Sequence, residues 1–179
     1  MKTVMLSIRP EWCEKIISRE KTIEVRKTRP KLDSPFKCYI YCTDGNTIYQ
    51  SNADGIIRLY RKKAHKNFQH HTVMNGKVIG EFICDEVMPM SVKYSVPECY
   101  AAMKEFPYTG MTDKQIIDYL GNGELGYGWH ISNLSIYDTP KELSAFQIRK
   151  DCGSYIKWHN LTRPPQSWCY VEELEGESE

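Results

Sequence analysis

The sequence predicts an α+β domain with a mainly antiparallel, closed sheet. About five segments have the composition of strands, and the clearest of them is FKCYIYC at residues 36–42. One early helix, one helical insertion and one late short helix interrupt these strands. They do not follow each strand in turn, as the crossover helices of a parallel sheet do. The pattern therefore favours an antiparallel sheet that closes on itself.

Length and charge limit the class of protein. A chain of 179 residues is most simply one domain. Lysine and arginine number 24 against 23 acidic residues, so a contact with nucleic acid has to come from a local patch. No apolar run approaches the ~20 residues of a membrane span. The apolar stretch after Met1 is too short for a secretory signal, and an odd number of cysteines, seven, is typical of reduced thiols. We expect a cytoplasmic protein.

The first half of the chain combines strands with one helix. Residues 3–8 form a short apolar strand, and a helix at about 10–18 begins with a proline, which is suited to a first helical turn. Residues 47–59 have the composition of a hairpin with its turn at 52–55. The longest predicted strand covers residues 77–88.

The second half begins with a helical insertion. Thr112 and Gln115 form a capping box, which predicts a helix that ends at Gly121. The glycine-rich stretch after it opens a strand at 129–137, and because a phosphate-binding glycine loop opens a helix, we reject that interpretation. The remaining expectations are a short helix at 141–146, a polar irregular stretch at 147–163, a final strand within 164–171 and a disordered acidic tail at 172–179.

Polar chemistry concentrates at residues 18–26. Ile23 and Val25 share one face of the expected strand. The other face and the turn before it carry two cations, a carboxylate and a hydroxyl, on Lys21, Thr22, Glu24 and Arg26. Three arrangements fit this set: a solvated surface strand, a structural ion-pair set that closes the helix-to-strand corner, and a polar pocket.

Residues 18–26, SREKTIEVR, resemble the Gly-x-Lys-x-x-Glu-x-Arg motif of the ASCH domain, in the PUA-like superfamily. The motif's glycine is replaced by Ser18 or Arg19, which indicates a slightly different turn. The resemblance covers one domain at 1–171, apart from insertions at about 45–75 and 95–122. The rest of the chain follows the family's order, with a helix before the motif, Gly80-Glu81 after Val78-Ile79, Trp129 ahead of Pro140, and a closing Gln166-Ser167-Trp168.

The resemblance implies a small PUA-like β-barrel with a cleft beside the first helix, which binds RNA or a nucleotide-like ligand. Lys21 and Arg26 are suited to hold a phosphate or a carbonyl oxygen, and Glu24 to accept from an exocyclic amine. Aromatic side chains can stack on a base, although each tryptophan has core packing as its alternative. The other ligand-binding candidates are Thr22, Tyr41, Trp129, His130, Gln166 and Trp168, with Tyr39 as an alternative to Tyr41.

An enzymatic function is the alternative, with Lys21 and Glu24 as candidate catalytic residues. Some small ASCH proteins are amidohydrolases that remove an acyl group from cytidine, with a lysine at the motif position and a nucleophilic threonine three residues later. Glu24 holds that threonine position here. Thr22 directly follows Lys21, and neighbours on a strand point to opposite faces, which separates a nucleophile from its activating base. A ribonuclease would use Lys21, Glu24 or His130 as acid and base.

A basic segment at residues 58–71 has two interpretations. It is either a solvated loop or a contact surface for a nucleic-acid backbone, with Tyr60 and Phe68 able to stack on bases. Its candidate phosphate contacts are Arg58, Arg61, Lys62, Lys63 and Lys66.

We expect no metal and no cofactor. Cys38 and Cys42 lie about 13 Å apart along one strand, at ~3.3 Å per residue, too far for one tetrahedral zinc ion. Cys152, His159 and Cys169 have no Cys-x-x-Cys spacing. The expected partner is nucleic acid, with RNA favoured, or a modified nucleoside, and not a membrane. The sequence leaves the oligomeric state open.

Overall fold

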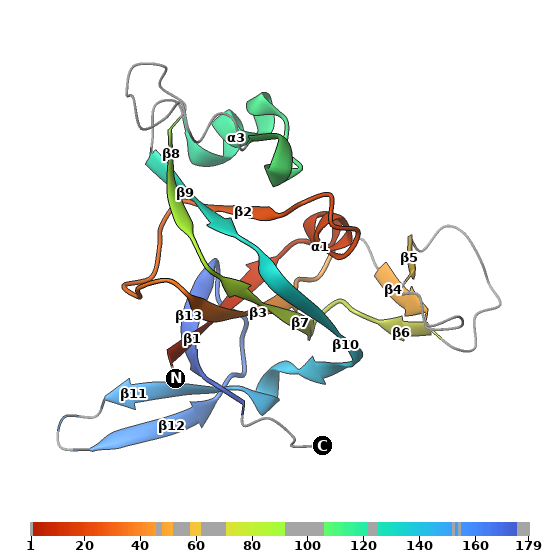
Figure 1. The fold of residues 1–179 in the computed structure, drawn as a ribbon. Coiled ribbons are helices and arrows are strands. Elements are labelled where there is room, and N and C mark those ends of the chain that lie inside the picture. Colours follow the sequence, from red (N-terminus) through yellow and green to blue (C-terminus); the bar gives the residue numbers. More distant parts are fainter. Residues whose placement is uncertain are drawn as a thin grey trace. The chain divides into compact units, whose positions relative to one another are not determined.

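The structure of the protein is a computed structural model, which describes residues 2–45, 48–51, 58–61, 71–91, 106–121, 125–151, 153 and 155–174 (Figure 1). The chain divides into two compact units. The first unit contains Met1–Glu14, Lys37–Glu81 and Ser135–Glu179, and the second contains Lys15–Phe36 and Phe82–Leu134. The single-domain organisation stays a prediction, and the expected disorder of the acidic tail falls mostly outside the described residues.

A five-stranded sheet forms the first unit, with strands in the order β10-β7-β3-β1-β13 (Figure 1). Strand β1 pairs in parallel with β3, Val4 opposite Cys38, and antiparallel with β13, Met5 opposite Cys169. The strands predicted around 3–8, 36–42 and 164–171 are present. The prediction of one longest strand at 77–88 is wrong, because that strand ends at Cys84, a separate strand in another sheet begins at Val87, and Ser132–Glu142 is longer. The bounds of the five strands of this sheet are β1 (Lys2–Ile8), β3 (Phe36–Cys42), β7 (Lys77–Cys84), β10 (Ser132–Glu142) and β13 (Trp168–Glu172).

Both faces of strand β3 are buried. Tyr39 and Tyr41 pack in one apolar cluster with Met5, Phe146 and other buried residues of the first unit, although their phenols are polar. The hydroxyl of Tyr39 accepts a hydrogen bond from the backbone N–H of Leu174 at 3.0 Å, which satisfies its polar end. A near-continuous apolar strand is typical of the centre of a sheet with both faces covered.

Two smaller sheets complete the first unit. Strand β4 pairs antiparallel with β5 and with β6, so the hairpin predicted at 47–59 is present, while its turn lies outside the described residues. Strands β11 and β12 form a second antiparallel hairpin. The bounds are β4 (Ile48–Ser51), β5 (Arg58–Arg61), β6 (His71–Val73), β11 (Gln147–Asp151) and β12 (Ile156–Asn160).

Two predictions for this region are wrong. Strand β10 continues through Pro140 to Glu142, and only a short 3-10 turn, η2 (Leu143–Ala145), follows where a helix was expected. Proline is tolerated there because β10 ends the sheet order, and an edge strand can lack a donor. The stretch expected to be irregular forms the β11–β12 hairpin. Phe146 and Leu161 are buried at the base of this hairpin, and the N–H of Leu161 donates to the carbonyl of Phe146 at 2.8 Å. These two residues fix the hairpin, so the polar residues of its strands need not show a strand pattern.

The second unit contains a three-stranded antiparallel sheet in the order β2-β9-β8 and the helix α3 (Figure 1). The bounds are β2 (Ile23–Arg26), β8 (Val87–Ser91), β9 (Leu125–His130), η1 (Phe106–Thr109) and α3 (Asp113–Leu120). The Thr112 capping box and the end at Gly121 are confirmed. The strand predicted at 129–137 is instead two strands, because the chain breaks at Ile131 and Asn133 adopts a left-handed φ of 47°.

Two glycines of β9 allow close packing in the second unit. A Cβ atom on Gly126 would lie 2.5 Å from a methyl carbon of Leu120, and one on Gly128 would lie 2.9 Å from both Ile23 and Met90. The glycine-rich stretch therefore serves helix and strand packing. Helix α1 (Pro10–Ile17) is present near its predicted bounds. No helix within the described ranges is long and apolar enough to cross a membrane.

Candidate functional site

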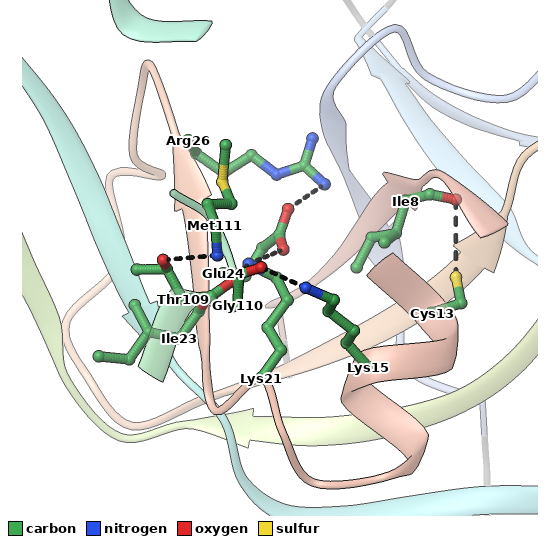
Figure 2. A network of polar contacts seen from close by, with 10 residues as sticks. All are labelled: Ile8, Cys13, Lys15, Lys21, Ile23, Glu24, Arg26, Thr109, Gly110 and Met111. Carbon is green, nitrogen blue, oxygen red and sulfur yellow. Dashed lines mark hydrogen bonds and ion pairs between the residues drawn. The ribbon is translucent and has the colours of Figure 1, made fainter. Parts of the chain in front are cut away.

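Lys21, Glu24 and Arg26 lie together in the second unit and are almost completely buried (Figure 2). Their exposed fractions are 2%, 6% and 5%. The interpretation of this segment as a solvated surface strand is therefore wrong. Both faces of β2 are buried, because Ile23 and Val25 on the apolar face are also covered.

Backbone contacts fix the segment that carries these side chains. The N–H of Lys21 donates to the carbonyl of Lys15 at 2.9 Å, at the end of α1. Arg19 between them has a φ of 64°, the left-handed conformation that favours glycine. In the motif that these residues resemble, a glycine stands two residues before the lysine, and Arg19 holds that position here with a φ that glycine favours. Its guanidinium donates to the carbonyl of Leu134 at 3.1 Å.

The ammonium group of Lys21 has three oxygen partners. Its Nζ atom donates to the carbonyls of Ile23 and Thr109, both at 2.7 Å, and lies 3.2 Å from Oε2 of Glu24. An ammonium group has three N–H donors, so these contacts are enough to satisfy it without water. Lys21 therefore ties the start of β2 to η1 and orients the Glu24 carboxylate.

Glu24 is shared by two cations. Its second oxygen, Oε1, lies 3.0 Å from Nη2 of Arg26, which is two residues along the same strand and on the same face, as the alternation predicts. Burial lowers the pKa of the Lys21 ammonium, and the neighbouring Glu24 carboxylate offsets part of that effect. The carboxylate thus lies at the centre of the buried set, between a lysine and an arginine.

A second lysine approaches the same group of residues. Lys15 of α1 donates from Nζ to the carbonyl of Gly110 at 2.5 Å (Figure 2). Gly110 has a φ of 66°, and Thr109 beside it accepts from the N–H of Met111 through its hydroxyl at 3.1 Å. Sequence reasoning missed Lys15, Thr109 and Gly110. The capping box that follows them marks a helix start, but it does not predict that the preceding carbonyls meet two lysines.

The β2–β9 register determines the neighbours of the motif residues. Trp129 stands directly opposite Glu24 and Tyr127 opposite Arg26. Side chains opposite each other in an antiparallel pair lie on the same face, so Trp129 is beside the carboxylate. The indole is completely buried and packs edge-on against Phe36, with 5.6 Å between the ring centroids. This burial against Phe36 agrees with the alternative given above for each tryptophan, that it packs in the core.

His130 lies on the other face of β9. It stands opposite Ile23, and its Nδ1 atom is 2.6 Å from Oδ1 of Asp85, with both side chains half-exposed. The structure does not bring the imidazole next to Glu24.

Thr22 is the remaining candidate of the second unit. Its backbone N–H donates to the carbonyl of Tyr108 at 2.9 Å, and its carbonyl accepts from the N–H of Ile131 at 2.8 Å.

Three ligand-binding candidates belong to the first unit. Tyr41 is buried in its core, and burial raises the pKa of the phenol. Gln166 is exposed. Trp168 packs edge-on against Tyr170 at 5.4 Å between centroids and is partly buried.

The predicted phosphate contacts of the basic segment fall mostly outside the described residues. Arg58 and Arg61 lie on β5, and nothing is described of their side chains. Lys62, Lys63 and Lys66 are outside the described ranges. Among the residues that the structure describes, five cysteines are free and no three metal-binding side chains form a group. The expectation of no metal stays a prediction.

The sequence matches no family model and no curated protein. Solved structures resemble the fold over most of its length. The ASCH protein of Zymomonas mobilis aligns over 96% of this chain and 88% of its own, with 16% identity and a TM-score of 0.53. A serine-to-alanine mutant of that protein aligns over 96% and 89%, with 15% identity and a TM-score of 0.59. A tyrosine-to-phenylalanine mutant aligns over 97% and 92%, with 15% identity and a TM-score of 0.53.

The chain has the ASCH fold. The resemblance seen in the motif and in the order of the segments is thereby confirmed at the level of the fold. The buried set Lys21, Glu24 and Arg26 consists of the residues whose spacing resembles the family's motif. Closure of its strands into a barrel stays a prediction, as do the cleft and the role of each site residue.

Proposed function

We propose that this ASCH-fold protein is a binding module for RNA or a modified nucleotide, with its polar site built on Glu24 and Arg26 and positioned by Lys21. The observation that carries the proposal is the burial of one carboxylate between two cations. Taking three charges out of water costs several kcal/mol per ion before their attraction is counted, and apolar residues often replace such sets without loss of stability. Buried, perturbed ionisable groups cluster at functional sites for this reason.

The contacts suggest a division of roles. The ammonium of Lys21 is surrounded by Ile23, Thr109 and Glu24, which supports a positioning role. Arg26 carries five donors in a planar fork, and its contact with Glu24 engages Nη2. A guanidinium of this kind suits a phosphate or a base carbonyl oxygen, and the carboxylate beside it suits an exocyclic amine.

The local charge favours an anionic ligand. Lys21 and Arg26 share the carboxylate of Glu24, and the charge of Lys15 acts on Lys21, so in the contacts described cations exceed anions in this part of the second unit. A phosphate group would restore the balance, whereas an uncharged nucleoside would not. Cytidine monophosphate combines a phosphate with an exocyclic amine and is therefore the first ligand to test.

Hydrolysis of RNA or of an acylated cytidine is the second candidate. One observation favours it: burial lowers the pKa of Lys21, and a neutral amine is a possible general base. Against it, Glu24 stands where the amidohydrolases of this fold family place a nucleophilic threonine, and Thr22 is engaged through its backbone only in the contacts described.

Two measurements separate the candidates. Calorimetric titration with cytidine, acylated cytidine and the four ribonucleoside monophosphates tests binding. Incubation of the wild type and Lys21→Ala with acylated cytidine and with single-stranded RNA tests turnover. We expect saturable binding of a monophosphate without turnover. Turnover that disappears in Lys21→Ala would favour the hydrolase. If the wild type shows no binding and no turnover, the ion-pair set has only a structural role.

A further inference from the structure

Strand β2 continues directly into a basic loop at residues 27–31, with the sequence KTRPK (Figure 1). Its cations, Lys27, Arg29 and Lys31, are exposed, whereas Pro30 between the last two is buried. Proline has a fixed φ, so its burial anchors the backbone of the loop in one conformation. A loop that is held in this way loses little conformational entropy when its cations bind a partner.

Two of these cations lie over tyrosine rings of the second unit. The Nζ atom of Lys27 is 5.7 Å from the ring centroid of Tyr119 in α3, and the Cζ atom of Arg29 is 5.9 Å from that of Tyr127 in β9. Such a contact contributes about 0.5–1 kcal/mol at an exposed site. A ring, unlike a carboxylate, does not cancel the charge of the cation. In the contacts described, both cations are therefore positioned without being neutralised.

Tyr127 connects the loop to the buried set. It stands directly opposite Arg26 in the β2–β9 pair, and opposed residues lie on the same face. One phenol ring thus has two arginines as neighbours, Arg26 from the strand and Arg29 from the loop. The three residues between them span at most about 10 Å, over which a nucleic-acid strand places two or three phosphates at one per ~3.4 Å of helix axis.

Positive charge exceeds negative charge along this stretch. Between positions 21 and 33 the sequence has five cations and two carboxylates, Glu24 and Asp33. Glu24 is shared by the two buried cations, so Asp33 is the one carboxylate of the stretch for the three exposed cations. In α3, Asp118 has its own partner, Lys114, at 2.6 Å. The surplus attracts a polyanion to the loop.

We propose that the loop at 27–31 binds the phosphate backbone of a single-stranded RNA, one base of which occupies the site at Glu24. The inference rests on the proposed function for that base and for the choice of RNA, and it names the ligand class as a strand instead of a free mononucleotide. Arg29 and Lys27 contact phosphates beyond the one at Arg26. The strand is single, because a base reaches so deeply buried a carboxylate only outside a helical stack.

Calorimetric titration of the full chain with cytidine monophosphate and with a cytidine tetranucleotide, at about 50 and about 200 mM salt, tests the proposal. The double variant Lys27→Gln with Arg29→Gln removes both ring-bound cations, and Arg29→Lys keeps the charge. Lys157→Gln is the control with the same type of charge loss, since Lys157 is an exposed lysine of β12 in the first unit. Circular dichroism checks that each variant is folded.

We expect the tetranucleotide to bind the wild type more tightly than the monophosphate does. Each neutralised phosphate of a single strand steepens the slope of log affinity against log salt by about 0.7, so two additional contacts weaken the tetranucleotide about sevenfold more than the monophosphate over this range. The double variant should lose this additional salt dependence and bind the monophosphate as the wild type does. Arg29→Lys and Lys157→Gln should keep it.

A tetranucleotide that binds the wild type no more tightly than the monophosphate would overturn the proposal. So would an additional salt dependence that the double variant keeps or that Lys157→Gln also loses, because the phosphates would then lie elsewhere. Equally tight binding of a glutamate oligomer of the same charge would mean that the loop recognises any polyanion. Monophosphate binding that is absent from the wild type, or unaffected by Glu24→Gln, contradicts the proposed function instead, so the two failures are distinguishable.

Discussion

The ammonium nitrogen of Lys21 lies 3.2 Å from Oε2 of Glu24, and only 1% and 8% of the two side chains are exposed. A pair this deeply buried differs from a surface ion pair, because water cannot replace a missing partner. The pair therefore holds Glu24 in one orientation, with its other oxygen directed at Arg26. The consequences for stability can be measured without knowledge of the ligand.

Replacing Glu24 by alanine should strongly destabilise the protein. The change leaves Lys21 and Arg26 as buried cations without their shared carboxylate, and breaking a buried ion pair in this way costs about 3–5 kcal/mol. Urea unfolding at neutral pH gives the free energy of unfolding. The control is Asp118→Asn, which removes an exposed ion pair with Lys114 and should cost no more than about 1 kcal/mol. Equal losses in the two variants would contradict the burial of the site.

The stability contributed by Lys21 should depend on pH. Burial lowers its pKa in the folded protein, so between that pKa and the ordinary value of about 10.4 the unfolded chain binds more protons. Below this window the cost of the buried charge is fully present, and it is relieved as the pH rises. The stability of the wild type relative to Lys21→Met should therefore increase in the alkaline range.

This comparison cancels the other groups that titrate at alkaline pH, among them Tyr39 and Cys84, whose pKa values burial raises in both proteins. Lys114→Met is the exposed control and should show no comparable change with pH. A wild-type advantage that stays constant, or that falls with rising pH, would mean that the pKa of Lys21 is not lowered.

Gly110 should tolerate alanine less well than Gly153 does. Both glycines have a left-handed φ, of 66° and 81°, so alanine strains either backbone by about 1–2 kcal/mol. A Cβ atom at Gly110 would in addition lie 3.0 Å from Cδ of Lys15, whose ammonium is bound to the Gly110 carbonyl, whereas nothing lies within 4 Å at Gly153. Thermal unfolding should show the larger loss for Gly110→Ala, and equal losses would argue against the Lys15 contact.

The sequence predicted the fold best where local rules and packing agree. The capping box at Thr112 satisfies helix donors within four residues, so it could be recognised without tertiary contacts. Pro140 misled the prediction, because a proline after a threonine signals a helix start unless an edge strand accommodates it. The β11–β12 hairpin could not be foreseen, since its anchors, Phe146 and Leu161, are brought together only by the core.

The candidate site was predicted in part for a similar reason. Alternation along β2 places Glu24 and Arg26 on one face, and a sequence displays that period directly. The approach of Lys15 and of the Thr109 carbonyl depends on contacts between segments that are distant in the sequence, as in the Lys21–Thr109 bond, which joins residues 88 positions apart. No local sequence pattern predicts a contact between residues so far apart in the chain. His130 shows the opposite case, since the strand register turns it toward Asp85 and away from Glu24.

The most direct test of the proposed function compares cytidine monophosphate and uridine monophosphate binding to the wild type and to Glu24→Gln by calorimetry. Glutamine keeps the size of the side chain but cannot accept with both oxygens, and a correct amine contact contributes about 1–3 kcal/mol of discrimination. We expect the wild type to prefer cytidine monophosphate by about tenfold and Glu24→Gln, checked for folding, to lose the preference. Equal binding of both nucleotides to the wild type, or a preference that survives in Glu24→Gln, would contradict the account.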